Sequence, residues 1–217
     1  MLEKMAEFFE ARLAGYDAHM LENIDGAREF YPFTASLLPK EPGSRLLDLG
    51  CGTGLELEAY FDLCPTVRVT GVDLSRGMLN ALKEKFPEKE LDLRCGSYFD
   101  LPFGAACFDA AVSVESLHHF TGEEKVPLYR KLWDALVSGG CFVLTDYFAR
   151  TEEEEKSCRR EALRLRREQG IPDGEFYHYD TPLTVEHEKE TLRLAGFSRV
   201  EILKNWGATY TLTAVKK

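Results

Sequence analysis

Three glycines at alternate positions are the residues of this chain whose spacing most clearly indicates chemistry. Gly50, Gly52 and Gly54 follow the apolar run 45–49 in the segment RLLDLGCGTG. Because glycine has no Cβ, such a turn allows unusual backbone angles and lets a ligand approach the main chain closely. The segment 55–61 has helical composition, so the turn opens a helix at the end of a strand. In an open α/β sheet, adenosine cofactors bind in this crevice.

An acidic residue stands where a ribose-binding group is expected. Carboxylates that hold the ribose hydroxyls usually lie about 20 positions after such a glycine turn. Asp73 occupies that position, at the end of a second apolar run, 67–72 (VRVTGV). Its carboxylate can accept two hydrogen bonds from a cis-diol. Strand, turn, helix, second strand and acid together predict a nucleoside site.

The glycine spacing also distinguishes between cofactors. The dinucleotide fingerprint GxGxxG needs a glycine at position 55, where this chain has Leu55. NAD and FAD are therefore disfavoured, and an NAD-dependent oxidoreductase stays only as an alternative. A phosphate-binding P-loop would need Gly-Lys-Ser/Thr, which the sequence lacks.

Several motifs in succession resemble one enzyme family. Asp48 and the three glycines form the pattern E/DxGxGxG, and the acid follows the second strand. GSYFDLPF at 96–103 and FDAAVSVESLHHF at 108–120 are similar to that family's GDAxxLPF and FDxVxxxxxLHH. Over 45–146 and 185–217 the chain thus resembles the class I S-adenosylmethionine-dependent methyltransferases. The resemblance implies S-adenosyl-L-methionine as cofactor and S-adenosyl-L-homocysteine as product.

The resemblance also implies roles for individual residues. The glycines would face the amino acid portion of the cofactor, Asp48 would orient its ammonium group directly or through water, and Asp73 would hold its ribose. Ser97 stands where the family usually has an Asp that contacts adenine, and it can still accept one hydrogen bond. The predicted cofactor-binding residues are Tyr16, Asp48, Gly50, Cys51, Gly52, Thr53, Gly54, Asp73, Leu74, Met78, Ser97, Tyr98, Phe99, Val114 and Glu115.

Two adjacent histidines are the candidate catalytic groups. His118 and His119 follow the fourth predicted strand, where the family places residues beside the transferred methyl group. Histidine titrates in a useful range, so either is a candidate general base, and a structural role in a turn is the alternative. The residues predicted to line the acceptor site are His19, Tyr31, Asp146, Tyr147, Tyr177 and Tyr179.

Cysteine usage predicts no metal centre. The six cysteines form no CxxC pair and no Cys/His cluster at metal-ligand spacing. We expect reduced thiols that pack as small apolar residues.

Composition and charge limit the class of protein. A chain of 217 residues with 44% hydrophobic content can bury one α/β core. Its net charge of -10 disfavours binding of long nucleic acid, which needs clustered Lys and Arg, although tRNA stays possible. The N-terminus, MLEKMAEFFEARL, has no uninterrupted apolar stretch, so neither a signal peptide nor a membrane span is expected there. We therefore expect a cytoplasmic enzyme without membrane attachment; the sequence predicts no oligomeric state.

The alternation of elements predicts a doubly wound, Rossmann-like α/β sheet. The short Trp206-Gly207 connection predicts that the last strand is antiparallel, and the family resemblance implies the strand order 3-2-1-4-5-7-6. Strands are expected at 45–49, 67–72, 91–95, 108–114, 140–146, 198–204 and 208–215, and helices at 54–62, 75–86, 123–137 and 185–195.

Two segments outside that core are expected to select the acceptor. An N-terminal helical cap has predicted helices at 2–14 and 18–38, with Asp17 as an N-cap. An insert after the fifth strand has a charged helix at 151–170 and an aromatic loop at 171–182, which forms a lid or packs on the sheet. The single predicted domain of 1–217 is thereby divided into 1–44, 45–146, 147–184 and 185–217.

The predicted function is methyl transfer from S-adenosylmethionine to a small or medium-sized acceptor. The segment SVES lacks the (Asn/Asp)-Pro-Pro-(Tyr/Phe) motif of enzymes that methylate exocyclic amines, which disfavours DNA and protein glutamine as acceptors. The segment TVEHEKETLRLAGFSRVEI also resembles carboxy-S-adenosylmethionine synthases, so such an activity, or one linked to tRNA modification, is an alternative. Another is a sensor or partner subunit that binds the cofactor without catalysis.

Overall fold

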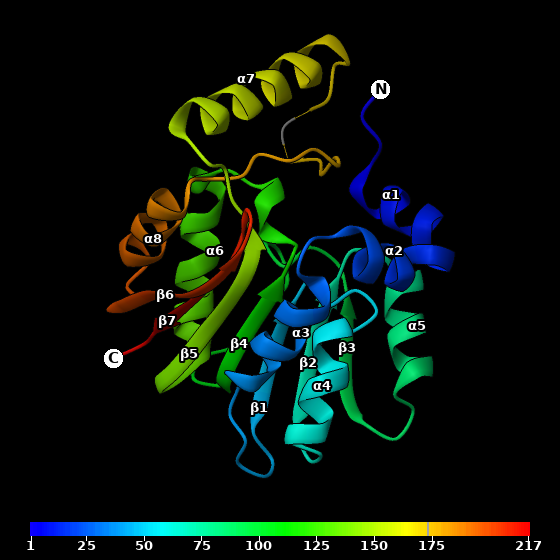
Figure 1. Cartoon of the computed structure of the whole chain (residues 1–217), viewed down its shortest axis with the longest axis vertical. Coiled ribbons are helices and arrows are strands. Elements are labelled where there is room, and N and C mark those ends of the chain that lie inside the picture. The colour runs from blue at the N-terminus through cyan, green and yellow to red at the C-terminus, as the bar shows by residue number, and fades with distance from the viewer. Residues whose placement is uncertain (173) are drawn as a thin grey trace.

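A seven-stranded sheet forms the centre of the protein (Figure 1). A computed structural model describes residues 1–172 and 174–217. The strand order is β3-β2-β1-β4-β5-β7-β6, and β7 runs antiparallel to both of its neighbours. These findings confirm the predicted fold class and strand order. The strands are β1 Arg45–Leu49, β2 Arg68–Asp73, β3 Glu90–Cys95, β4 Phe108–Val114, β5 Leu136–Tyr147, β6 Arg199–Trp206 and β7 Thr209–Val215.

Helices cover both faces of this sheet. One face is packed by α3, α4 and α5, and the other by α6 and α8. Asp173 of the predicted 171–182 loop lies outside the described residues. The helices are α1 Met5–Arg12, α2 Tyr16–Asn23, α3 Ala27–Ser36, α4 Leu55–Leu63, α5 Arg76–Lys85, α6 Gly122–Ala135, α7 Glu152–Glu168 and α8 Val185–Leu194, with short 3₁₀ turns η1 Leu13–Gly15 and η2 Leu117–His119.

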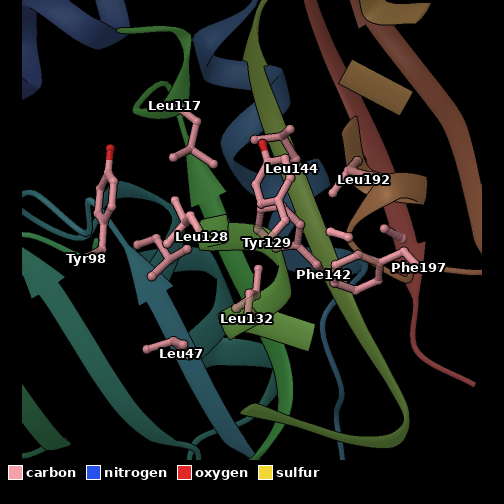
Figure 2. Packing of buried hydrophobic residues seen from close by; sticks show 14 of the residues in the cluster. Leu47, Tyr98, Leu117, Leu128, Tyr129, Leu132, Phe142, Leu144, Leu192 and Phe197 are labelled. Atoms are coloured by element: carbon pink, nitrogen blue, oxygen red, sulfur yellow. The ribbon is translucent and has the colours of Figure 1, made fainter. Parts of the chain in front are cut away.

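Strand β1 shows how the sequence fills both cores. Successive side chains of a strand point to opposite faces, and Leu46 and Leu47 are both buried, on opposite sides. Leu47 joins the cluster that contains Leu128 and Leu132 of α6, which Figure 2 shows packed together with Tyr129 and Phe142. A strand buried on both faces reads as a continuous apolar run, which explains why the sequence pattern located it correctly.

The N-terminal helices are shorter than predicted. The predicted helix 18–38 is two helices, because Gly26 adopts a left-handed conformation with φ 79° between α2 and α3. A Cβ at Gly26 would lie 2.5 Å from the Trp206 side chain, so the break lets the C-terminal hairpin pack closely. Asp17 is not an N-cap: α2 begins at Tyr16, and Gly15 precedes it.

The parallel strands end at one edge of the sheet, and the segments outside the core gather there. Figure 1 shows α1, α2 and α7 at this end, with α7 lying beyond the sheet rather than packed on either face. The N-terminal segment also pairs with the insert, since Lys4 forms a β-bridge with Tyr177. In the part of the chain that the structure describes, no helix is long and apolar enough to cross a membrane.

Candidate functional site

The glycine turn lies at the carboxyl end of β1, next to the end of β4. Gly50 and Gly52 have φ values of 72° and 47°, a region that favours glycine. A Cβ at Gly50 would lie 2.1 Å from Ser116 Oγ, so a larger residue does not fit between the two strands. A Cβ at Gly52 would have the Tyr16 ring as its nearest neighbour, at 3.8 Å. This part of the turn therefore faces a space bordered by α2.

Asp73 is anchored to that turn at the end of β2. Its carboxylate accepts hydrogen bonds from the backbone N–H groups of Gly52, at 2.9 Å, and Ser75, at 2.8 Å. A carboxylate has about four lone-pair positions, so about two stay available to a diol. Burial raises the pKa of Asp73, and these backbone hydrogen bonds act in the opposite direction. This geometry suits the predicted ribose contact.

Asp48 lies beneath the turn and lines neither of the cavities described below. It is fully buried, and neither carboxylate oxygen has a hydrogen-bond partner among the described residues. Burial and the neighbouring buried carboxylate of Glu56 raise the pKa of Asp48 well above its usual range. Asp48 therefore reaches neither cavity directly, and its contact with the cofactor's ammonium group through water stays a prediction.

The segment expected beside adenine is held by a residue that the sequence interpretation missed. Tyr98 lines the cavity at the glycine turn, whereas Ser97 and Phe99 do not. Lys131 Nζ, on α6, donates to the carbonyl oxygens of Tyr98, Phe99 and Leu101 at 2.5, 2.7 and 3.0 Å. An ammonium group with three donors suits three converging carbonyls. A lone Lys in an amphipathic helix gives no sequence signal for this role.

Helix α1 covers the glycine turn. Met5 and Phe9 line the same cavity as Gly52 and Asp73, and the remaining space is about 40 Å³. Glu10 fastens the helix, because its carboxylate accepts from Ser75 Oγ at 2.6 Å and from the Gly77 N–H at 3.0 Å. The donors and the carboxylate around the turn fit an adenosine cofactor, and Met5 and Phe9 of α1 border the space beside them.

A larger cavity of about 900 Å³ adjoins this turn. Four residues, Phe9, Tyr16, Glu115 and His119, line both cavities, so the two spaces meet at these side chains. The predicted acceptor-site residues His19 and Tyr147 also line the large cavity, whereas Tyr31 and Asp146 do not. Tyr31 is buried in the core beneath α2, which explains its position away from the cavity.

Glu115 has a strained backbone where the two cavities meet. Its φ of 49° lies in the left-handed region, which is uncommon for a residue with a Cβ and costs about 1–3 kcal/mol. Its carboxylate accepts from Thr209 Oγ1 at 3.1 Å. Burial and the nearby Asp146 raise the pKa of Glu115 to about 7. The side chain is thus held between the glycine turn and the large cavity.

His118 is fixed by a carboxylate behind it. Its Nδ1 lies 2.6 Å from Asp146 Oδ1, and Asp146 also accepts from the backbone N–H groups of Leu117 and Tyr147, both at 2.9 Å. Burial lowers the pKa of His118, but the carboxylates of Asp146, Asp180 and Glu115 more than offset burial and raise it to about 9. Asp146 therefore orients the imidazole and leaves Nε2 toward the cavity.

His119 has different surroundings. Burial and the adjacent His118 lower the pKa of His119 to about 4. Its Nδ1 lies 3.0 Å from Asp180 Oδ1, yet the atoms are not aligned for a hydrogen bond, and neither has another partner among residues 1–172 and 174–217. Burial raises the pKa of Asp180, but the three neighbouring histidines, 118, 119 and 178, reverse this and lower it. These groups form the polar wall of the large cavity.

The loop after α7 contributes residues other than those predicted. Tyr177 and Tyr179 line a separate cavity of about 430 Å³, whereas His178 and Asp180 line the large one. Alternate residues of an extended segment point to opposite sides, which explains why the two pairs line different cavities. His178 stacks on Phe8 of α1, with ring centroids 3.5 Å apart. In the sequence, the charge and hydrogen-bonding capacity of His178 and Asp180 were the features that could have identified them as residues lining the large cavity.

The remaining predicted cofactor residues divide into two groups. Leu74 and Met78 line the cavity at the turn. Several residues lie in or near the turn but do not line that cavity: Cys51, Thr53, Gly54 and Val114. Cys51 packs beneath the turn, with its Sγ 2.8 Å from where a Cβ at Gly71 would lie.

Comparison with known proteins identifies the central part of the chain. The family profile described as "Methyltransferase domain" matches residues 47–144, which include the glycine turn, Asp73 and the two histidines. A biotin biosynthesis bifunctional protein, BioHC, from Teredinibacter turnerae is 30% identical over 167 residues, covering 73% of this chain. The chain spans only 27% of that protein's length.

Two further proteins are similar over nearly the whole chain. A carboxy-S-adenosyl-L-methionine synthase from Nitratiruptor sp. is 24% identical over 100% of this chain and 95% of its own length. A Haemonchus contortus phosphoethanolamine N-methyltransferase 2, crystallised with S-adenosylhomocysteine, has a TM-score of 0.71 at 17% identity, covering 98% of this chain and 59% of that one. The second similarity concerns the fold alone.

Proposed function

The chain belongs to the class I S-adenosylmethionine-dependent methyltransferases, and on this premise we propose that it methylates a small molecule bound in the large cavity. The observation that carries the proposal is the shared wall of the two cavities. Phe9, Tyr16, Glu115 and His119 border both the glycine turn and the space of about 900 Å³. An acceptor in the large cavity would therefore lie next to the cofactor.

The residues around the turn would hold S-adenosylmethionine, the cofactor of this family. Bound there, it supplies an activated methyl group, so the protein mainly has to position the acceptor and exclude water. Asp73 would accept from the ribose hydroxyls. Tyr98 and Met78 would border the adenine, and the backbone at Gly52 would lie against the amino acid portion. These assignments follow from position in the cavity and the family resemblance.

The large cavity indicates the chemistry of the acceptor. Among its described lining residues, Arg12 is the only Lys or Arg, and its guanidinium already pairs with Glu3 at 3.2 Å. His118 also carries a positive charge near neutral pH, but it is already paired with Asp146 at 2.6 Å. A polyanionic acceptor would therefore find little free compensating charge, whereas a neutral molecule with hydroxyl groups would find imidazole and carboxylate partners. Both predicted bases line the large cavity and only His119 also borders the glycine turn, so we propose that His119 lies where the acceptor meets the cofactor.

Calorimetry tests the cofactor part of this proposal. The purified chain is titrated with S-adenosylmethionine, S-adenosylhomocysteine and NAD. Micromolar binding of the first two without NAD binding supports the proposal and justifies a screen of small hydroxylated acceptors with labelled methyl groups. NAD binding alone would contradict the functional proposal and would leave the fold unaffected.

A carboxy-S-adenosylmethionine synthase is the second candidate, because that relative matches the chain from end to end. Such an enzyme would have to hold an additional carboxylate on the cofactor, and a positively charged group in the cavity would be expected. Arg12 is available only if it leaves Glu3. Mass analysis of the nucleoside that co-purifies distinguishes the candidates, because a carboxylated cofactor is heavier than S-adenosylmethionine by one carboxyl group.

A further inference from the structure

Two histidines and one aspartate converge on the wall of the large cavity. His118 Nε2 and His119 Nδ1 lie 3.6 and 3.0 Å from the same oxygen, Asp180 Oδ1. These donor atoms all lie within 4.8 Å of one another. Imidazole nitrogen and carboxylate oxygen are ligands that divalent first-row transition metals accept, and two histidines with one carboxylate leave other coordination positions open.

The distances are those of ligands around one ion. With metal–ligand bonds of about 2.1 Å, neighbouring ligand atoms lie about 3.0 Å apart at right angles and about 3.4 Å apart in a tetrahedron. The two measured separations, 3.0 and 3.6 Å, are close to these values. The shorter contact is not aligned as a hydrogen bond, and neither His119 Nδ1 nor Asp180 Oδ1 has another partner among the described residues. Both atoms are buried, and a cation would satisfy them.

The contact between His118 and Asp146 is typical of a metal-binding histidine. A metal-bound histidine commonly donates its other ring nitrogen to a carboxylate, which fixes its orientation. His118 Nδ1 contacts Asp146 at 2.6 Å, and Asp146 is itself held by two backbone N–H groups. A second grouping, Glu115 with His118 and Asp146, is less suitable, because it would use the nitrogen already engaged by Asp146.

We propose that His118 Nε2, His119 Nδ1 and Asp180 Oδ1 bind a divalent transition-metal ion at the wall of the large cavity. Cysteine and histidine spacing did not predict such a site, because Asp180 comes from the insert and the histidines from the end of β4. The open positions would face the cavity and could bind an acceptor with two neighbouring oxygen atoms. This use in catalysis rests on the proposed methyl transfer, whereas metal binding itself does not.

Cobalt is the probe for this site. The untagged chain is treated with chelator, dialysed and titrated with Co²⁺, while the visible absorption of the ion is followed. We expect saturation at one ion per chain and displacement by Zn²⁺. Asp180→Asn and His119→Gln should abolish the saturable signal, and Asp146→Asn, which changes a positioning residue, should weaken affinity by about 10- to 100-fold. His187→Gln is the matched control and should bind as the wild type does.

Histidine NMR of the wild type makes the test independent of whether the variants fold. The chain has five histidines, and paramagnetic Co²⁺ should shift the rings of His118 and His119 most strongly. Absence of saturable binding, or binding that both ligand variants retain, overturns the metal site. S-adenosylmethionine binding without Co²⁺ binding would overturn this inference alone, and Co²⁺ binding without cofactor binding would overturn the proposed function alone.

Discussion

Asp17 Oδ1 accepts a hydrogen bond of 2.5 Å from Thr53 Oγ1, which joins helix α2 directly to the glycine turn. The other oxygen of Asp17 lies 2.5 Å from Lys85 Nζ on α5. One side chain thus connects the N-terminal cap to two elements of the predicted cofactor site. Asp17 reaches both partners because α2 lies across the turn.

Replacing Asp17 should destabilise the protein more than replacing its ion-pair partner, Lys85. Asp17→Ala leaves the buried Thr53 hydroxyl without its acceptor, so the free energy of unfolding should fall by about 1–3 kcal/mol. Lys85→Met is the control and should cost about 1 kcal/mol or less, because that ion pair is partly exposed. Urea unfolding measures both variants. An equal loss in the two would show that the Thr53 bond contributes nothing.

Asp73 should determine cofactor affinity. Asp73→Ala removes the carboxylate that would accept from the ribose, and each charge-assisted hydrogen bond is worth about 1.5–3 kcal/mol. Binding of S-adenosylmethionine should weaken by about 10-fold or more. Asp73→Asn keeps one acceptor oxygen and should retain part of the affinity. Because Asp73 also anchors Gly52 and Ser75, thermal unfolding without ligand separates damage to the turn from loss of the contact.

Glu10 should control the opening of α1. Glu10→Ala removes the hydrogen bonds to Ser75 and Gly77 that hold the helix over the turn. Without these two bonds α1 should open more often, so amide hydrogen exchange in residues 5–12 should become faster. Exposed Glu7 on the same helix gives the control, Glu7→Ala, for which unchanged exchange is expected. Equal exchange in both variants would contradict a fastening role for Glu10.

Local patterns were sufficient to locate the strands and the turn, whereas the strand order was implied by the family resemblance. β1 has three leucines among its five residues, the turn needs glycine, and Asp73 ends the next strand, so each feature depends on residues close in sequence. The helical cap could be predicted only in part, because the Gly26 break depends on Trp206 from the far end of the chain.

The polar wall of the large cavity could not be predicted in the same way. His119 and Asp180 lie close together because the segment after α7 packs against the end of β4. No local sequence pattern predicts this packing. The backbone contact that fixes it joins the Thr181 N–H to the His118 carbonyl oxygen at 2.8 Å. Lys131 was missed for the same reason, since its three carbonyl partners lie on another element.

A buried ion pair between α6 and α8 should be important for stability. Lys125 Nζ lies 2.6 Å from Glu188 Oε2, both side chains are almost fully buried, and the Tyr129 hydroxyl donates to the same carboxylate. Glu188→Ala leaves an uncompensated buried ammonium group and should lower the free energy of unfolding by about 3–5 kcal/mol. The double variant Lys125→Met with Glu188→Leu should recover part of this loss in chemical denaturation. No recovery would show that the charge is not the cause.

The contact between α7 and α8 should make stability depend on pH. His187 Nδ1 lies 2.8 Å from Glu155 Oε2, and this carboxylate, with Glu152 and Glu190 nearby, raises the pKa of His187 despite the opposing effect of burial. A raised pKa in the folded state means that the protonated imidazole stabilises the fold. The contribution is complete below the unfolded pKa of about 6.5 and disappears as pH rises through the folded value.

His187→Gln measures this contribution. The difference in Tm between wild type and variant should be largest below about pH 6 and should shrink toward pH 8. Glu155→Gln removes the partner and should abolish the same pH dependence. Arg159, which is on the same helix and pairs with Glu123, provides a control: Arg159→Gln should leave the pH dependence unchanged. A wild-type advantage that grew with rising pH would have the wrong sign and would exclude the protonated His187–Glu155 pair as its source.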